Sequence, residues 1–274
     1  MNIFNKKHII ITGGSSGVGR VLAGRLAERG AHIALIARGP EKLESVAAEV
    51  RSRAGKQQQI ACFSCDVADA DEVETTFERI ASDFGVPHML INSAGILEEG
   101  YFETHTLDVF RRVMDINFFG TLHCIRAALP YMKTAGGGRI VNIASVAGLI
   151  GVFGYTAYCA SKHAIVGLTA ALRMELKPQN IRIHLVCPPE FDSPMVDAIN
   201  ADRTPENEKI THTIPVMTAE AVADAVIRGI EQNRFEIIPG VITKALTRLN
   251  RHFPGIGRAI TDAKIRKYYQ GPGV

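Results

Sequence analysis

The sequence contains no uninterrupted apolar run of about 18 residues, the length that a membrane-spanning helix requires. Its first residues, MNIFNKKHIIITGG, enter a short apolar run almost at once, which leaves no room for the apolar segment of a signal peptide. These two absences predict a cytoplasmic protein.

Cysteine is scarce: the chain has five, an odd number that does not suit a disulfide framework and favours reduced thiols. Cys62 and Cys65 form a C-x-x-C pair, but no second pair or nearby histidine completes a zinc site. We therefore predict no metal site. Both cysteines are expected in an apolar strand, with a redox role as the alternative.

Excess charge is also small, because the formal net charge is only +3. The chain as a whole is therefore not expected to bind nucleic acid. The charge is uneven, however: residues 241–274 carry seven Lys or Arg and one acid, a balance of +6, which leaves −3 for residues 1–240.

Linkers, internal repeats and low-complexity tracts are missing, which favours one large domain. Short apolar runs separated by helical patterns follow one another along residues 1–240, as is typical of a parallel sheet covered on both faces. We predict a doubly wound α/β (Rossmann) fold. Its strands are expected at residues 8–12, 32–37, 59–66, 88–95, 139–145, 181–188 and 234–239, and its long helices at 105–132, 158–177 and 218–232.

Two further segments do not belong to this alternation. Residues 190–217 are polar, contain prolines and are too long for a passive loop, so we predict a lid over the site. Residues 241–274 form a basic extension that begins with an amphipathic helix. Its apolar stripe is Val241, Ile242, Ala245, Leu246, Leu249 and Phe253. Such a helix suits a membrane surface, although helices docked on their own domain or on a partner subunit share the pattern.

The stretch TGGSSGVG, residues 12–19, lies between the first expected strand and the first expected helix. Glycines at this place let the backbone approach a pyrophosphate, and the helix N-terminus favours negative charge. The predicted contacts are Gly13, Ser15, Ser16, Gly17, Val18 and Gly19. The second strand ends in Ala37 and Arg38, with no carboxylate for a ribose hydroxyl. Arg38, helped by Ser15, can instead hold a 2′-phosphate, so we predict NADP(H) in preference to NAD(H).

The stretch YTAYCASK, residues 155–162, holds two tyrosines and a lysine. Tyr158 and Lys162 are four residues apart and share one helix face, whereas Tyr155 has only Cys159 at that spacing. The charge of Lys162 is expected to lower the pKa of Tyr158 so that it can act as an acid or base. Taken alone, the pair is compatible with a packing role, and Tyr155 is expected to be a pocket or packing residue.

These residues together resemble the short-chain dehydrogenase/reductase family along nearly the whole chain. The matching pieces are TGGSSGVG, DV (66–67), NSAG (92–95), Asn117, Ser145 and YCASK (158–162). The resemblance implies that Ser145, Tyr158, Lys162 and Asn117 are catalytic, with Tyr158 transferring a proton while a nicotinamide transfers hydride. It also implies cofactor contacts from Asp66, Val67, Asn92, Ala94, Gly95, Tyr158, Lys162, Pro188 and Ser193. Ser93 and Pro189 depart from the usual pattern, in which an Asn and a Gly are found.

The segment from Gly151 to Ile181 and the following CPPEFDSPM look like the 3-ketodihydrosphingosine reductase branch of that family. This implies an NADPH-dependent ketone reductase acting on a long-chain lipid, a small-molecule substrate. Eukaryotic members of the branch carry membrane segments, and this chain shows none. The peripheral membrane contact that we expect on the cytoplasmic face therefore rests on the basic amphipathic residues 241–274. The long helices at 105–132 and 158–177 imply a homodimer or homotetramer. Two alternatives stay open: a 3-oxoacyl-thioester or hydroxysteroid oxidoreductase, and a catalytically silent protein that senses NADP.

Overall fold

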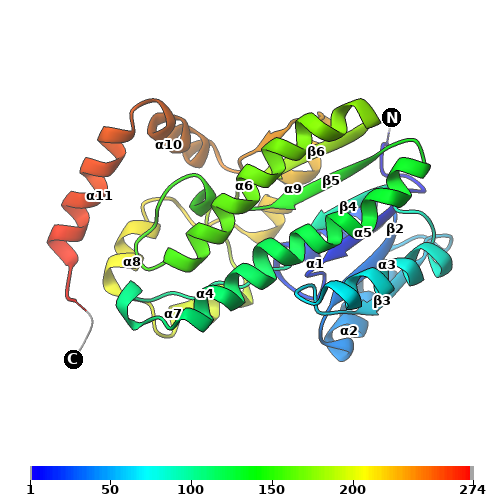
Figure 1. The fold of residues 1–274 in the computed structure, drawn as a ribbon, viewed down its shortest axis with the longest axis horizontal. Coiled ribbons are helices and arrows are strands. Elements are labelled where there is room, and N and C mark those ends of the chain that lie inside the picture. The colour runs from blue at the N-terminus through cyan, green and yellow to red at the C-terminus, as the bar shows by residue number, and fades with distance from the viewer. Residues whose placement is uncertain (1, 272–274) are drawn as a thin grey trace.

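The computed structural model describes residues 2–271. Seven parallel strands form one sheet in the order β3-β2-β1-β4-β5-β6-β7 (Figure 1). The strands are β1 (His8–Thr12), β2 (His32–Ala37), β3 (Ile60–Ser64), β4 (Met89–Asn92), β5 (Gly138–Ile143), β6 (Ile181–Val186) and β7 (Glu236–Ile237). This architecture confirms the predicted doubly wound α/β fold.

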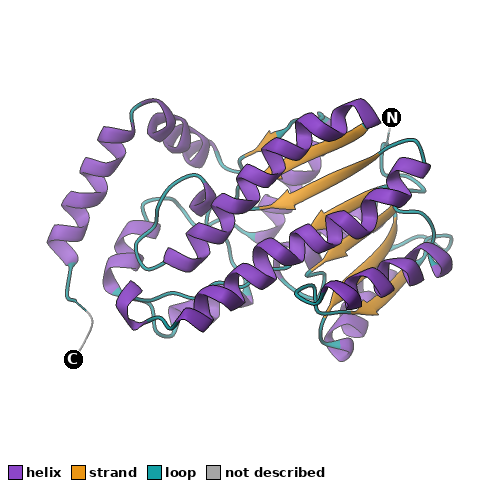
Figure 2. Ribbon diagram, in the orientation of Figure 1, coloured by secondary structure: helices purple, strands orange, loops and turns teal. Residues whose placement is uncertain are grey.

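Helices cover both faces of the sheet (Figure 2). One face packs against α1 (Gly17–Ala27), α2 (Pro40–Arg53) and α9 (Ala219–Glu231), and the other against α3 (Ala70–Asp83), α5 (Gly120–Thr134) and α6 (Thr156–Leu176). The side chains of a strand alternate between these layers. In β1, Ile9 and Ile11 join the first layer and Ile10 joins the second, and all three are fully buried.

The structure differs from the predicted boundaries where the backbone leaves the sheet. Strands β3 to β7 each end two or three residues before the predicted limit, because the residues that follow enter the loops at the carboxyl edge of the sheet. The helix predicted at 105–132 is divided into α4 (Leu107–Met114), a π-helical turn η2 (Asp115–Phe119) and α5. A π turn is common at functional sites because it inserts an extra residue into the helix.

The segment predicted as a lid is largely helical. It contains α7 (Pro194–Asn200) and α8 (Pro205–Thr211). Ser193 begins α7 by accepting a hydrogen bond from the Val196 N–H at 3.3 Å, and Thr204 begins α8 in the same way. These helices are too short to show an apolar periodicity in the sequence. Each begins with a capping residue that is followed directly by a proline. The short 3₁₀ turns are η1 (Phe102–Thr104), η3 (Val146–Gly148) and η4 (Lys177–Gln179).

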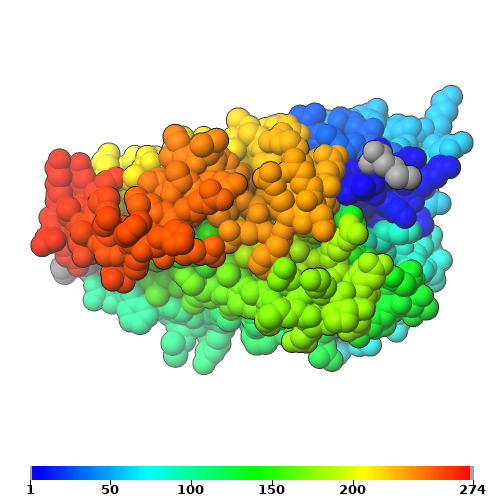
Figure 3. Space-filling view, turned by 90° about the horizontal axis from the view of Figure 1, so that it is seen from above, coloured from blue at the N-terminus to red at the C-terminus, as the bar shows by residue number. Residues whose placement is uncertain are grey.

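The C-terminal extension forms α10 (Val241–His252) and α11 (Pro254–Tyr268) at one end of the molecule (Figure 1; orange to red in Figure 3). α11 packs against α8, and the Gln270 backbone N–H donates to the buried Glu206 carboxylate at 2.7 Å. Glu206 also accepts from the Tyr101 hydroxyl at 3.0 Å. The extension is therefore fastened to the lid segment. Within residues 2–271, no helix is long and apolar enough to span a membrane.

Candidate active site

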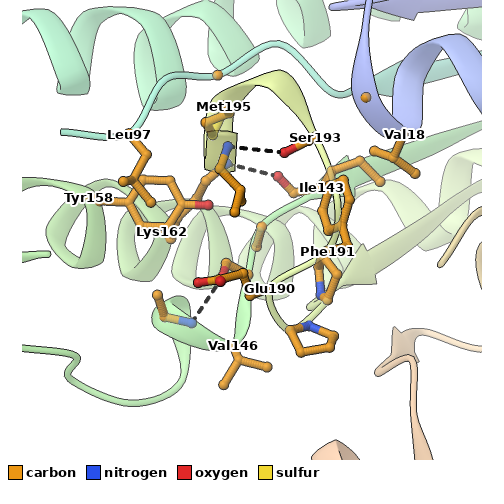
Figure 4. A pocket seen from close by; sticks show the side chains of 18 of the residues that line it. Val18, Leu97, Ile143, Val146, Tyr158, Lys162, Glu190, Phe191, Ser193 and Met195 are labelled. Atoms are coloured by element: carbon orange, nitrogen blue, oxygen red, sulfur yellow. Dashed lines mark hydrogen bonds between the residues drawn. The ribbon is translucent and has the colours of Figure 1, made fainter. Parts of the chain in front are cut away.

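A cavity of about 220 Å³ opens at the carboxyl edge of the sheet (Figure 4). Its walls come from the loop after β1, the ends of β4 and β5, the start of α6 and residues 188–214. The carboxyl ends of parallel strands are where open α/β sheets bind ligands, because the connecting loops separate there. The two lid helices contribute side chains to the cavity, among them Met195 and Ile210.

The glycine-rich loop is held tightly against the end of β4. Gly13 has a φ of +65°, and a side chain there would come within 2.8 Å of the Ala94 backbone. A side chain at Gly19 would lie 2.5 Å from the Gly13 carbonyl oxygen. The Thr12 hydroxyl fastens the two loops by accepting from the Ser93 and Ala94 N–H groups, both at 3.1 Å. Only glycine allows the backbone to approach this closely.

Ser16 stands at the N-terminus of α1 with an extended backbone. Its hydroxyl makes no capping hydrogen bond within the described part of the chain. The first N–H groups of a helix have no partner inside the helix and point outward. Together with Gly17 and Val18, which also line the cavity, Ser16 presents a helix end that suits an anion.

The residues predicted for the adenosine half lie outside the cavity lining, along the same edge of the sheet. Arg38 directly follows β2 and is exposed, and its backbone carbonyl accepts from the Ser64 hydroxyl at 2.9 Å. Asp66 and Val67 follow β3, and the Asp66 carboxylate accepts from the Ala68 N–H at 3.0 Å. The Gly14 N–H donates to the Ile36 carbonyl at 3.2 Å, which joins the glycine loop to the end of β2. Ser15 is half-buried in that loop.

Asn92 differs from its predicted place. The backbone from Ser93 to Gly95 lines the cavity, but the Asn92 side chain is buried and donates to the Asn142 side chain at 2.8 Å. Asn142 in turn donates to the Thr169 hydroxyl at 2.9 Å. The Asn92 Nδ2 group thus ties β4 to β5, and within residues 2–271 the buried Asn92 Oδ1 has no hydrogen-bond partner.

Tyr158 and Ser145 meet in the wall of the cavity. Ser145 begins η3, and its hydroxyl accepts from the Ala147 N–H at 3.1 Å. Burial raises the pKa of Tyr158 above its ordinary value, and a hydrogen bond with Ser145 lowers it in part. This net direction is opposite to the predicted lowering, because burial outweighs the neighbouring groups. Burial therefore favours the protonated form of Tyr158 in this pocket.

Lys162 lies one helical turn beyond Tyr158 and is buried. Its Nζ is 5.4 Å from the centre of the Tyr158 ring and donates to the Ile143 carbonyl at 3.1 Å, its one acceptor within residues 2–271. Burial lowers the pKa of Lys162 to about 8. An ammonium has three N–H donors, so two remain for a ligand in the cavity.

Asn117 is fully buried in the π turn η2. Its amide accepts from the Ile96 N–H at 2.8 Å and donates to the Ile96 carbonyl and the Ser161 hydroxyl, both at 2.9 Å. A side chain at Gly95 would lie 3.1 Å from Asn117 Oδ1 and 3.5 Å from Lys162 Nζ. Asn117 thus fixes the chain after β4 next to Lys162.

Pro188, Pro189 and Ser193 line the opposite wall. The Pro188 carbonyl accepts from the Val146 N–H at 2.9 Å, which holds the loop after β6 against the loop after β5. The second proline is compatible with this arrangement because a proline removes a backbone N–H but no carbonyl. Ser93, the other departure from the family pattern, contributes its backbone to the wall.

Two polar residues of the site have no clear signal in the sequence. Glu190 lines the cavity. Arg203 lies outside the cavity lining and forms an ion pair with the Glu190 carboxylate at 2.5 Å. Both come from the segment predicted only as a lid, and their separation of 13 positions along the chain gave no sign of a contact. Tyr155 lines the same cavity, as predicted, and its hydroxyl accepts from Arg203 at 3.0 Å.

The arrangement fits a nicotinamide dinucleotide. The close backbone at Gly13, the free helix end at Ser16 and the two available donors of Lys162 supply a pyrophosphate cradle and a hydroxyl-binding group. Within residues 2–271, no group of histidine, cysteine and carboxylate side chains could hold a metal ion.

Comparison with known proteins supports this interpretation. A family model for short chain dehydrogenases matches residues 7–204. The 3-dehydrosphinganine reductase of Danio rerio is 39% identical over 233 residues, which cover 84% of this chain and 70% of that protein. The 3-ketodihydrosphingosine reductase of Dictyostelium discoideum is 34% identical over 265 residues, covering 91% of this chain and 78% of that one.

Among solved structures, a short-chain dehydrogenase/reductase from Burkholderia phymatum, in complex with NAD, superposes with a TM-score of 0.82 at 26% identity. The match covers 93% of this chain and 96% of that chain. The predicted resemblance is confirmed, including the similarity to 3-ketodihydrosphingosine reductases. With its glycine loop and its Tyr158–Lys162 pair, the chain belongs to the short-chain dehydrogenase/reductase family of nicotinamide-dependent oxidoreductases.

Proposed function

We propose that this enzyme is an NADPH-dependent reductase of a long-chain ketone, with 3-ketodihydrosphingosine as the preferred substrate. The observation that carries the proposal is the position of Ser145 and Tyr158 in a cavity whose other walls are largely apolar. These walls include Leu97, Ile150, Val152, Met195, Val196, Ile210 and Ile214. An apolar wall favours an alkyl chain, because burying it removes apolar surface from water. The names of the relatives point to the same substrate.

Each residue of the site has its own role in carbonyl reduction. A bound reduced nicotinamide supplies the hydride. Ser145 and Tyr158 hydrogen-bond the carbonyl oxygen of the substrate, and Tyr158 gives that oxygen its proton. The positive charge of Lys162 stabilises the phenolate that remains. Asn117 acts as a positioning residue, since its side chain holds the Ile96 backbone beside Lys162.

The preference for NADP(H) rests on Arg38. Its guanidinium belongs to an exposed residue directly after β2, where a family member selective for NAD would carry a carboxylate. The solved relative from Burkholderia phymatum binds NAD, so the fold alone does not choose the cofactor. A guanidinium at this place favours a 2′-phosphate by charge and by its paired donors.

The extension supports peripheral membrane contact. α10 turns Thr243 and Thr247 towards the protein, and it leaves Val241 87% and Phe253 58% exposed. Lys244, Arg248 and Arg251 accompany this apolar stripe. An apolar and basic helix surface suits a bilayer with anionic headgroups, such as the cytoplasmic leaflet. A long-chain substrate would be drawn from that bilayer, and residues 190–217 would act as the lid.

Self-association is proposed for the face that carries α4 and α6. Leu107 and Met174 are 70% and 68% exposed on these helices. A homodimer or homotetramer would cover them, and sedimentation velocity tests this directly. A monomer at micromolar concentration would contradict the proposal.

The deciding experiment follows NADPH oxidation with 3-ketodihydrosphingosine, acetoacetyl-CoA and a ketosteroid in parallel. Turnover of the sphingoid ketone alone supports the proposal. Turnover of the thioester or the steroid alone would assign the enzyme to that substrate class instead. A stable NADPH complex with no turnover of any ketone would indicate a cofactor-sensing protein.

A further inference from the structure

A buried ion pair stands beside the catalytic tyrosine and has no part in the chemistry described above. Arg203 donates to both carboxylate oxygens of Glu190, at 3.1 and 2.5 Å. The Glu190 and Arg203 side chains are only 11% and 4% exposed. Arg203 also donates to the Tyr155 hydroxyl at 3.0 Å. These three residues form the Glu190 cluster.

Only two members of the cluster reach the cavity. Glu190 lines it (Figure 4). Tyr155 also lines it, whereas Arg203 is not part of the lining. The Tyr155 ring centre is 5.8 Å from that of Tyr158, so the cluster adjoins the place where the carbonyl is reduced. The wall of the cavity that holds the Tyr155–Tyr158 pair therefore carries a carboxylate as well, while the guanidinium that pairs with this carboxylate lies outside the cavity lining.

Glu190 and Tyr155 each have hydrogen-bonding positions that Arg203 does not use. A carboxylate offers about four lone-pair positions, of which the arginine fork uses two. The Tyr155 oxygen accepts from Arg203, so its own hydrogen is free for a ligand. Burial raises the pKa of Tyr155 to about 12, although Arg203 opposes this shift, and the hydroxyl stays protonated. The wall offers a negatively charged acceptor beside a neutral donor.

We propose that Glu190 and Tyr155 form a subsite for the ammonium group and the neighbouring hydroxyl of a long-chain amino ketone. Arg203 is a positioning residue that fixes both side chains. The inference rests on the proposed function and names what selects the substrate. In 3-ketodihydrosphingosine the carbon next to the carbonyl bears an amino group, and the carbon after that bears a hydroxyl. An ammonium buried at this place without an acceptor would be costly, and a β-keto thioester or a steroid has no ammonium to offer.

The test compares two ketones of equal chain length, one with the amino group and one with hydrogen in its place. For the wild-type enzyme we expect kcat/KM to favour the amino ketone by about 100-fold, as hydrogen-bonding sites discriminate against analogues that lack the partner group. Glu190→Gln keeps the shape of the side chain but removes its charge. It is expected to reduce the preference to less than about 5-fold while the rate with the deamino ketone stays within about 3-fold. Glu208→Gln, the same change on the outer side of α8, is expected to leave the preference unchanged.

A binding measurement separates this inference from the proposed function. Calorimetry with NADP present would give Kd for the saturated long-chain amino diol and for the matching diol without nitrogen. If the enzyme reduces neither ketone but prefers the amino diol, and Glu190→Gln abolishes that preference, the subsite stands and the proposed reaction is overturned. Equal Kd values in the wild type, no binding of either diol, or an amine preference that survives in Glu190→Gln would overturn the subsite.

Tyr155→Phe provides a second variant in case Glu190→Gln does not fold. It removes one hydroxyl and keeps the ring. We expect it to raise KM for the amino ketone by about 10-fold with little change in kcat, because the lost contact is equally strong in the ground state and in the transition state. An unchanged KM would exclude Tyr155 from the subsite.

Discussion

The Lys162 ammonium donates to the Ile143 carbonyl oxygen at 3.1 Å and so joins α6 to the end of β5. This bond directs a buried charge towards the cavity without neutralising it, since a carbonyl carries only a partial charge. Burial consequently lowers the pKa of Lys162 to about 8.

The first prediction concerns the pH dependence of ketone reduction. Lys162 is charged below pH 8 and loses its charge as the pH rises through the pKa of about 8. We expect kcat/KM to be constant below this value and to fall about tenfold per pH unit well above it, because one proton is lost. A pH profile of Lys162→Arg checks the assignment. Arginine stays charged, so a variant that is active but keeps the break would show that another group titrates.

The second prediction separates the two tyrosines of YTAYCASK. Tyr158→Phe removes the proton donor and should lower kcat by about 1,000-fold, within the usual contribution of general acid catalysis. Tyr155→Phe should retain nearly the wild-type kcat. Single-turnover rates measured with saturating ketone would give both values. Equal loss in the two variants would refute the assignment of Tyr158 as the sole acid.

The third prediction tests cofactor choice. Arg38→Asp replaces a phosphate-binding cation by the carboxylate that suits a ribose hydroxyl. The ratio of kcat/KM for NADPH to that for NADH should fall by about 100-fold, since a charge-assisted contact is lost and a repulsion is gained. Arg126→Asp on the exposed side of α5 is the control for charge alone. A similar fall in the control would assign the effect to long-range electrostatics.

The fourth prediction concerns the closest backbone contact in the phosphate loop. A side chain at Gly19 would lie 2.5 Å from the Gly13 carbonyl oxygen, whereas one at Gly151 would meet nothing within 4 Å. Gly19→Ala should reduce the free energy of unfolding by about 1–3 kcal/mol, the usual cost of overpacking. Gly151→Ala should change it by less than about 0.5 kcal/mol. Urea denaturation of both variants provides the comparison, and equal stabilities would mean that the loop relaxes freely.

The fifth prediction addresses the exposed stripe of α10. Leu249→Glu should lower co-sedimentation with anionic phospholipid vesicles by about 10-fold, because it removes buried apolar surface and adds a repulsive charge. Reduction of a short, water-soluble ketone should not change. Gln57→Glu, at an exposed position outside the extension, controls for the added negative charge. Equal sedimentation of Leu249→Glu and wild type would argue that the stripe binds protein instead.

The order of strands and helices could be predicted because buried parallel strands are apolar along their whole length, as in HIIIT and HIALIA. The residues at which these strands end could not be predicted. In HMLINSAG the apolar pattern continues through Ala94, but β4 stops at Asn92, where the backbone turns to bond with Thr12. The π turn around Asn117 could not be predicted either, since one extra residue in a helix hardly changes the spacing of its apolar residues.

The site was predictable where spacing along one element decides geometry, as for Tyr158 and Lys162 on α6. It was not predictable where distant segments meet. The contact of Glu190 with Arg203 depends on the course of the lid helices. The sign of the pKa shift at Tyr158 depends on burial, which spacing does not reveal. The amphipathic character of α10 is evident in the sequence, but only the packing shows that the threonine side is the one turned inward.

The bond from the Gln270 N–H to Glu206 has a practical consequence. A carboxylate that belongs to α8, a wall of the substrate cavity, is partly satisfied by one of the last residues of the described chain. An affinity tag or a protease cut near residue 270 would therefore act on substrate entry, although it lies far from Tyr158 along the sequence. A tag at the N-terminus, which precedes β1, lies away from this contact. It therefore allows the lid to be studied undisturbed.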